Sequence, residues 1–130
     1  MSFTFPVRVY WEDTDAGGVV FYANYLKFFE RARTEWLRSL GLEQQALRDR
    51  TGGMFVVTEA KLRYRQPARL DDLLQVSAVL TQRGLATLAI EQRVTRADVC
   101  LCEGAMRIGW VDATRWRPAR IPSEIMESLK

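Results

Sequence analysis

A sequence of 130 residues is long enough for a single domain, spanning 1–130, that buries roughly two thirds of its unfolded surface without disulfides or metals. The apolar share of 48% and the charged share of 27% are those of a folded globular chain, and a net charge of +3 lacks the dense basic stripe of a nucleic-acid-binding protein. Histidine is absent, which excludes Ser-His-Asp and Cys-His catalysis and a His-ligated zinc site within the chain.

The N-terminal third predicts a strand, a loop and a long helix. Apolar and polar residues alternate from about 5 to 11, and Pro6 places this strand at a sheet edge. A helix is expected from about 24 to 40, because apolar residues recur there at helical spacing and Gly41 follows as a stop signal. Glu30 and Arg33 lie three residues apart in this helix and are expected to form a stabilising ion pair. A short helix is expected over 43–50.

The rest of the chain predicts four strands, because apolar and polar residues alternate with a period of two. The first strand is expected to place six residues on one face: Met54, Val56, Thr58, Ala60, Leu62 and Tyr64. The others cover about 74–81, 85–96 and 99–111, and a short C-terminal helix over 123–129 is expected to begin with Ser123 as its N-cap. Cys100 and Cys102 share one face of the last strand, a poor geometry for a disulfide, so both are expected to be reduced.

One strand, one long apolar helix and four strands in a meander indicate the α+β class, with a five-stranded antiparallel sheet wrapped around one central helix. The edge strands of such a sheet need protection, so oligomerisation by sheet extension is expected. No N-terminal segment resembles a signal peptide and no apolar stretch is long enough for a membrane span, which favours a cytoplasmic location.

Candidate chemistry is concentrated in an acidic, glycine-containing loop that leads into the long helix. Asp13 and Asp15 lie two residues apart, Gly17 and Gly18 permit close backbone approach, and the helix start offers unpaired N–H groups. The same pattern is typical of a turn in which carboxylates accept hydrogen bonds from loop N–H groups, and this interpretation stays open on the residues alone. Calcium binding is disfavoured, because the acidic ligands are not at the required spacing.

The loop and its surroundings, taken together, resemble a family signature. The resemblance is carried by residues 10–20 (YWEDTDAGGVV), 24–25 (NY) and 30–33 (ERAR), and it continues through 67–72 (PARLDD) over nearly the whole chain. The sequence resembles hotdog-fold acyl-CoA thioesterases of the 4-hydroxybenzoyl-CoA thioesterase class. Within that class it is most similar to the small YbgC-type enzymes associated with the Tol-Pal cell-envelope system.

This resemblance implies a hotdog domain that hydrolyses an acyl thioester of coenzyme A, or of acyl carrier protein, without a metal or an organic cofactor. Asp15 takes the position of the catalytic carboxylate, which attacks the thioester carbonyl or activates a water; both roles stay open. The backbone N–H of Tyr22 takes the position that polarises this carbonyl. Histidine is common at the Tyr22 position in similar sequences, so the phenol is expected to alter acyl-group preference.

The resemblance further implies substrate contacts at Gly17, Gly18, Val19 and Arg83. Lys61, Arg63 and Arg65 are other candidates for the coenzyme A phosphates, because alternation places them on one face of a strand, but a solvated outer sheet face explains their positions at least as well. It also implies a homo-oligomer, a dimer or a tetramer, with the active site at a subunit interface. The alternative is a non-catalytic hotdog domain that binds acyl thioesters or proteins in lipid metabolism or envelope assembly. Only the enzyme needs an ionised Asp15 aligned with a helix N-terminus. A hotdog dehydratase is disfavoured, because histidine is absent.

Overall fold

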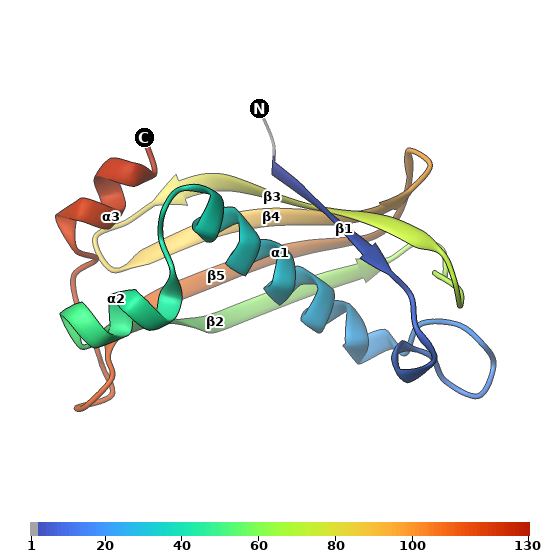
Figure 1. Cartoon of the computed structure of the whole chain (residues 1–130), viewed down its shortest axis with the longest axis horizontal. Helices are drawn as coiled ribbons and strands as arrows, with labels where there is room; N and C mark the ends of the chain where they lie inside the picture. The colour runs from blue at the N-terminus through green and yellow to red at the C-terminus, as the bar shows by residue number, and fades with distance from the viewer. Residues whose placement is uncertain (1–2) are drawn as a thin grey trace.

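The computed structural model describes residues 3–130 as a curved antiparallel sheet wrapped around one long helix (Figure 1). The strands lie in the order β1-β3-β4-β5-β2, and a short β6 pairs with the end of β5. Their bounds are β1 Phe3–Arg8, β2 Gly53–Tyr64, β3 Leu73–Arg83, β4 Thr87–Arg96, β5 Val99–Asp112 and β6 Arg117–Pro118. The helices are α1 Tyr25–Ser39, α2 Gln44–Thr51 and α3 Ser123–Ser128. The α+β hotdog architecture expected from the sequence is confirmed.

Helix α1 is fixed to the sheet by its apolar stripe, as expected. The buried members recur at helical spacing and are Tyr25, Phe28, Phe29, Ala32, Trp36 and Leu37. The first four pack in one core cluster with Val76 and Met106. Trp36 and Leu37 pack in a second cluster with Leu88 and Ile108. Full burial of one large apolar side chain contributes roughly 1.5–3 kcal/mol, so this stripe outweighs the helix propensities of the individual residues.

The strand order differs from a simple meander. β3, β4 and β5 are neighbours in sequence and in space, but β2 pairs with β5 at one edge of the sheet, and β1 pairs with β3 at the other. The prediction of four consecutive neighbours was therefore wrong for β2, whereas the edge position of the Pro6 strand is confirmed. The connection 65–72 is too long for a tight hairpin, and backbone hydrogen bonds from Arg65 to Leu101 and from Val20 to Ala68 hold it in place.

Strand β2 contains a bulge that exchanges its two faces. Its register against β5 shifts between Val57 and Glu59, so the predicted alternation holds from Ala60 onward and is wrong before the bulge. Before the bulge, Phe55 pairs with Trp110 and packs against the core, where the prediction had placed its neighbours Met54 and Val56. The bulge therefore turns Phe55 and Val57 to the same side of the sheet as α1.

Three further local predictions can be compared with the structure. The strand predicted to reach about residue 11 ends at Arg8, and Trp11 lies in the 3-10 turn that follows, where it is 78% exposed. Ser123 is the first residue of α3 and not its cap, which is Pro122. Cys100 and Cys102 are both free, as expected, and burial raises the pKa of Cys102 to about 12.

The expected ion pair within α1 does not form in the described chain. Glu30 accepts a hydrogen bond from Thr34, and Arg33 donates to Gln92 in the interior. Within residues 3–130, no helix combines the length and the apolar character that crossing a bilayer requires.

Candidate active site

Asp15 lies at the tip of a tight loop between β1 and α1. Its N–H donates to the carbonyl of Val19 at 2.9 Å, and its carbonyl accepts from the N–H of Gly18 at 3.1 Å. Gly18 has a φ of 79°, a left-handed conformation that favours glycine. The side chain is exposed, and Oδ1 accepts the N–H of Gly17 at 2.8 Å. This bond orients the carboxylate, while Oδ2 accepts no hydrogen bond within the described residues.

Asp13 has a different environment, although it lies two residues away. Its side chain is 4% exposed, Oδ2 accepts the N–H of Tyr10 at 2.9 Å, and Oδ1 accepts Nδ2 of Asn24 at 3.0 Å. The carbonyl of Asp13 also accepts the N–H of Phe21 at 3.0 Å. Both carboxylate oxygens thus join the loop to the start of the helix, so Asp13 shapes the loop.

The loop ends in a 3-10 turn, Tyr22–Asn24, that leads directly into α1. The backbone N–H groups that open a helical segment have no partner in a preceding turn, and Tyr22 and Ala23 occupy these positions. Aligned peptide dipoles add partial positive charge there. The side chain of Tyr22 is 65% exposed. The helix start therefore offers N–H donors to a negatively polarised oxygen beside the Asp15 loop.

A cavity of about 270 Å³ opens beside this helix start. Three tyrosines from different elements form its aromatic wall. The ring of Tyr64, at the end of β2, lies edge-on to Tyr22 and to Tyr25, with centroid distances of 6.5 and 5.5 Å. The hydroxyl of Tyr64 donates to the carbonyl of Tyr22 at 2.8 Å, and the hydroxyl of Tyr25 accepts the N–H of Ala68 at 3.1 Å. The wall is held by hydrogen bonds as well as by ring contacts.

Two of these tyrosines were missed at the level of sequence. Tyr25 belongs to the apolar stripe of α1 and was assigned to the core, and Tyr64 was assigned to one face of a strand. Desolvation raises the pKa of both hydroxyl groups, although the hydrogen bond from Ala68 partly opposes this for Tyr25. Both hydroxyl groups therefore stay protonated near neutral pH and act as hydrogen-bonding groups, not as bases.

The predicted substrate-binding residues fall into two groups. Gly17, Gly18 and Val19 lie in the loop itself, and Val19 forms a β-bridge with Arg69 of the 65–72 connection. Arg83 is the last residue of β3, at the end of the sheet near α3, where it donates to the carbonyl of Leu129 at 3.3 Å (Figure 1). One chain therefore does not bring Arg83 to the Asp15 loop.

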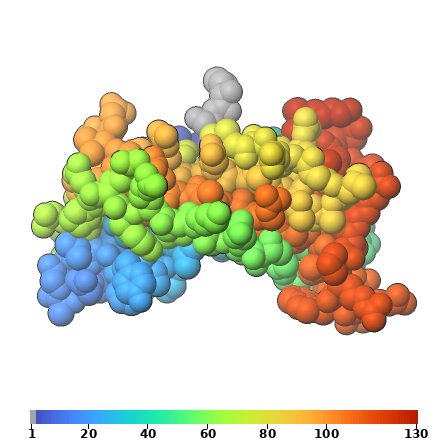
Figure 2. All heavy atoms as spheres, turned by 180° about the vertical axis from the view of Figure 1, so that it is seen from behind, coloured from blue at the N-terminus to red at the C-terminus, as the bar shows by residue number. Residues whose placement is uncertain are grey.

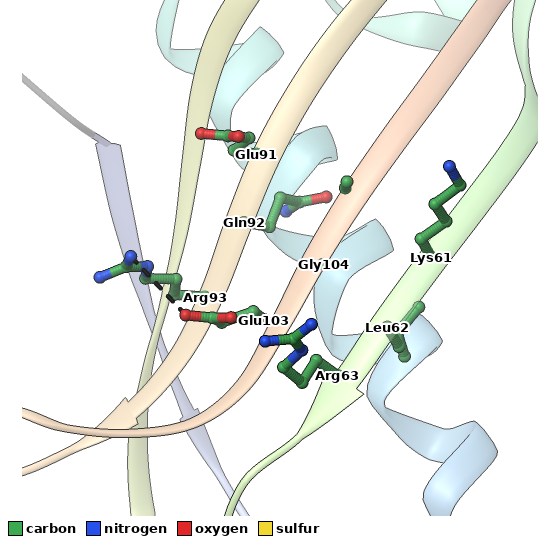
Figure 3. Close-up of a pocket in the computed structure, with 9 residues that line it drawn as sticks. Lys61, Leu62, Arg63, Glu91, Gln92, Arg93, Glu103 and Gly104 are labelled. Carbon is green, nitrogen blue, oxygen red and sulfur yellow. Dashed lines mark ion pairs between the residues drawn. The ribbon is translucent and has the colours of Figure 1, made fainter.

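The other basic candidates lie on the sheet face opposite α1, which no helix covers (Figure 2). Lys61 and Arg63 border a hollow of about 370 Å³ on this face (Figure 3). Glu103 pairs with Arg65 at 3.2 Å and with Arg93 at 3.7 Å, whereas Lys61 and Arg63 form no ion pair in residues 3–130. This face carries mixed charge, and Arg65 alone of the three candidates also lines the aromatic cavity.

Comparisons with known proteins identify chains related to this one. The family model of the thioesterase-like superfamily matches residues 9–129. The acyl-CoA thioesterase YbgC of Haemophilus influenzae is 46% identical over 124 residues, covering 95% of this chain and 91% of the relative. The acyl-CoA thioester hydrolase YbgC of Escherichia coli O6:H1 is 42% identical over 129 residues, covering 98% and 96% of the two chains.

Solved structures show the same similarity. The crystal structure of a probable thioesterase from Bartonella henselae superposes with a TM-score of 0.88 at 31% identity, over 94% of this chain and 100% of that one. The structure of a hypothetical protein from Aquifex aeolicus reaches a TM-score of 0.92, also at 31% identity, over 98% and 99% of the two chains. From the match over residues 9–129 and the high identity to these relatives, we conclude that the chain belongs to the thioesterase-like superfamily.

Proposed function

We propose that the protein hydrolyses an acyl thioester of coenzyme A to the free acid and the thiol. The names of its relatives in Haemophilus influenzae and Escherichia coli support this activity. The observation that carries the proposal is the carboxylate of Asp15, which is exposed, oriented by Gly17 and open at Oδ2, beside a helix start and an aromatic cavity. A carboxylate and aligned N–H donors are the two groups that thioester hydrolysis needs when histidine is absent.

In this mechanism the thioester carbonyl carbon faces Asp15, and the carbonyl oxygen accepts the N–H of Tyr22. Asp15 either attacks the carbon or removes a proton from an attacking water. In both cases negative charge develops on the carbonyl oxygen and the carbon–sulfur bond breaks. If Asp15 attacks, a mixed anhydride between Asp15 and the acyl group forms, and a water molecule hydrolyses it to the free acid while the thiolate takes a proton from solvent. If Asp15 acts as a base, the water oxygen bonds to the carbonyl carbon, and the proton held by Asp15 passes to the thiolate. Losing one donor to such an oxygen typically costs about 100- to 1,000-fold in rate. The Tyr22 ring, held against Tyr64, shapes the space for the acyl group.

The coenzyme A or carrier-protein end of the substrate carries phosphate, so it favours the basic side of the cavity. Arg65 lines the cavity, and Lys61 and Arg63 lie on the neighbouring sheet face. We place Gly17, Gly18 and Val19 against the pantetheine, because loop backbone allows close approach. Arg83 takes part only if a second copy of the chain brings it to the site.

We also place the site at the interface of a homo-oligomer. The cavity lies next to β2, a strand of twelve residues at the sheet edge, and apolar side chains beside it are exposed. Val57 and Tyr64 of β2 are 49% and 48% exposed, and Leu26 of α1 is 43% exposed. A second copy that extends the sheet would cover these side chains and enclose the substrate.

Asp15→Asn tests the catalytic role. Release of free thiol from short, long and aromatic acyl-CoAs is expected to fall about 10²- to 10⁴-fold, with unchanged thermal unfolding. Asp98→Asn is the matched control, because Asp98 is an exposed aspartate in the β4–β5 turn with a φ of 67°, a conformation that asparagine tolerates. Undiminished turnover by the Asp15→Asn variant would exclude Asp15 as the catalytic group. Negligible wild-type rates across the whole panel would instead favour a binding role.

A further inference from the structure

Arg33 is a charged side chain in the interior of the protein without a charged partner. It is 7% exposed, and Nη1 donates to Oε1 of Gln92 at 2.9 Å. Gln92 is 1% exposed and is itself fixed, because Nε2 donates to the carbonyls of Phe29 at 3.0 Å and Ser77 at 3.1 Å. No carboxylate of residues 3–130 lies within ion-pair distance of Arg33. Desolvation lowers its pKa, and the more distant charge of Glu30 opposes this.

The guanidinium of Arg33 borders a cavity of about 230 Å³ between α1 and β2. Only one of its five N–H groups is used by Gln92, and Nε and Nη2 have no acceptor in the described chain. The cavity is otherwise mainly apolar, with walls from Leu37, Phe55 and Val57. Because a buried charge without a partner is costly, an arginine in an apolar cavity suits a ligand with a negatively charged group.

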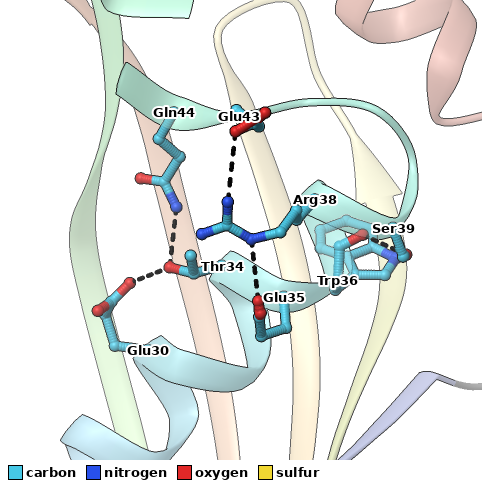
Figure 4. Close-up of polar contacts among 8 residues, drawn as sticks. All are labelled: Glu30, Thr34, Glu35, Trp36, Arg38, Ser39, Glu43 and Gln44. Carbon is cyan, nitrogen blue, oxygen red and sulfur yellow. Dashed lines mark hydrogen bonds and ion pairs between the residues drawn. The ribbon is translucent and has the colours of Figure 1, made fainter. Parts of the chain in front are cut away.

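The polar residues at the edge of this cavity are engaged with each other instead of with Arg33. Thr34 donates to Oε2 of Glu30 and accepts Nε2 of Gln44 at 3.0 Å (Figure 4). Both Glu30 and Gln44 are exposed and also line the cavity. The one carboxylate near Arg33 is therefore directed to a hydroxyl on the next turn of α1, which leaves the guanidinium available.

The Arg33 cavity and the aromatic cavity lie along the same border between α1 and β2. Between them lie apolar side chains of both elements: Leu26 of α1, and Ala60 and Leu62 of β2, which share the α1 side of the sheet after the bulge. Along the helix axis, the eight residues from Tyr25 to Arg33 correspond to about 12 Å. A long acyl chain can therefore extend from the helix start over these apolar side chains and past Glu30 toward the guanidinium.

We propose that Arg33, held in place by Gln92, binds a carboxylate at the far end of the acyl chain. The preferred substrates are then thioesters of dicarboxylic acids, in preference to neutral acyl groups of the same length. This inference rests on the proposed thioesterase function and specifies its substrate class. The carboxylate would accept charge-assisted hydrogen bonds from Nε and Nη2, which are stronger than hydrogen bonds between neutral groups.

The test compares kcat/KM for dodecanedioyl-CoA and dodecanoyl-CoA, which have the same chain length and are long enough to span this distance. Wild-type protein is expected to prefer dodecanedioyl-CoA, and Arg33→Gln, which keeps a donor for Gln92, is expected to lower the ratio of the two values about tenfold or more. Arg31→Gln is the matched control, because Arg31 is exposed on the same helix, and it should leave the ratio unchanged. The same ratio in wild type and Arg33→Gln would overturn the proposal.

Two further measurements keep the result interpretable. If thermal unfolding shows that Arg33→Gln does not fold, Val57→Phe narrows the cavity from the half-exposed sheet edge and must also lower the ratio. If the wild type hydrolyses neither thioester, the proposed function fails, and calorimetric binding of the same two thioesters then tests the Arg33 site directly. Equal affinities for the two thioesters would reject the Arg33 proposal. It would also be rejected if Arg33→Gln changed only self-association, because that result would mean that the cavity binds a carboxylate of a second copy of the chain.

Discussion

Two aspartates separated by a single residue show how burial decides what a carboxylate does. Both oxygens of Asp13 accept hydrogen bonds in the interior, from Tyr10 and Asn24, so its carboxylate connects the loop to the start of the helix. Asp15 accepts one bond, from Gly17, and faces solvent. A reacting carboxylate needs a free oxygen, and of the two only Asp15 has one.

This difference predicts opposite effects on stability. Asp13→Ala should lower the free energy of unfolding by about 1–3 kcal/mol, because Asn24 Nδ2 and the N–H of Tyr10 lose their buried acceptor. Asp15→Ala should change it by less than about 0.5 kcal/mol, as is usual for exposed positions. Urea titration of the two variants measures both values. Equal losses would show that Asp15 also supports the fold.

At the level of elements, the start of β2 requires glycine at position 53, because the Trp110 ring leaves no room for a side chain there. A Cβ on Gly53 would lie 2.5 Å from three atoms of the Trp110 indole ring. Gly53→Ala should therefore destabilise the protein by about 1–3 kcal/mol, as overpacking in a core typically does. A double-mutant cycle with Trp110→Phe, followed by urea unfolding, should show that the smaller ring removes most of this cost. Additive effects of the two changes would mean that the strand itself moves to accept the Cβ.

The elements with local periodicity were the ones that could be predicted. The apolar stripe of α1 and the alternation in β4 and β5 depend on neighbours within a few residues, and their bounds were predicted to within about two residues. The bulge in β2 was not predictable in this way, because it is defined against β5, about fifty residues later.

The same reasoning applies to the site. The Asp13–Val19 loop could be recognised from its own residues, whereas the role of Asp15 was implied only by the family resemblance. Tyr64 and Arg33 could not be recognised in this way, because their importance comes from contacts with Tyr22 and Gln92, which are distant in the chain. The three-residue spacing of charges on the helix predicted Glu30 as the partner of Arg33, whereas Arg33 donates to Gln92.

For the whole molecule, the two edges of the sheet are unequal. β1 has six residues, includes Pro6, which cannot donate a backbone hydrogen bond, and lies beside β3. β2 has twelve residues and lies next to both cavities that border α1. We therefore expect sheet extension through β2, giving a particle of twice the mass of the chain.

Sedimentation of two edge variants tests this expectation. Ala60→Arg places a charge on the exposed β2 edge and should shift the protein to the monomer with loss of thioester hydrolysis. Thr4→Arg makes the equivalent change on exposed β1 and should leave mass and activity unchanged. A dimer that survives Ala60→Arg and dissociates with Thr4→Arg would assign the interface to the opposite edge.

The loop that carries Asp15 is hydrogen-bonded to the 65–72 connection in the middle of the chain. Leu70 donates its N–H to the carbonyl of Gly18 at 3.2 Å, and the N–H of Val20 donates to the carbonyl of Ala68 at 2.8 Å. During synthesis on the ribosome, the loop therefore cannot form its hydrogen bonds to residues 68–70 until the middle of the chain has emerged. The sheet is complete only when β5 pairs with β4 and β2. The Asp15 loop therefore becomes ordered only when most of the domain has folded.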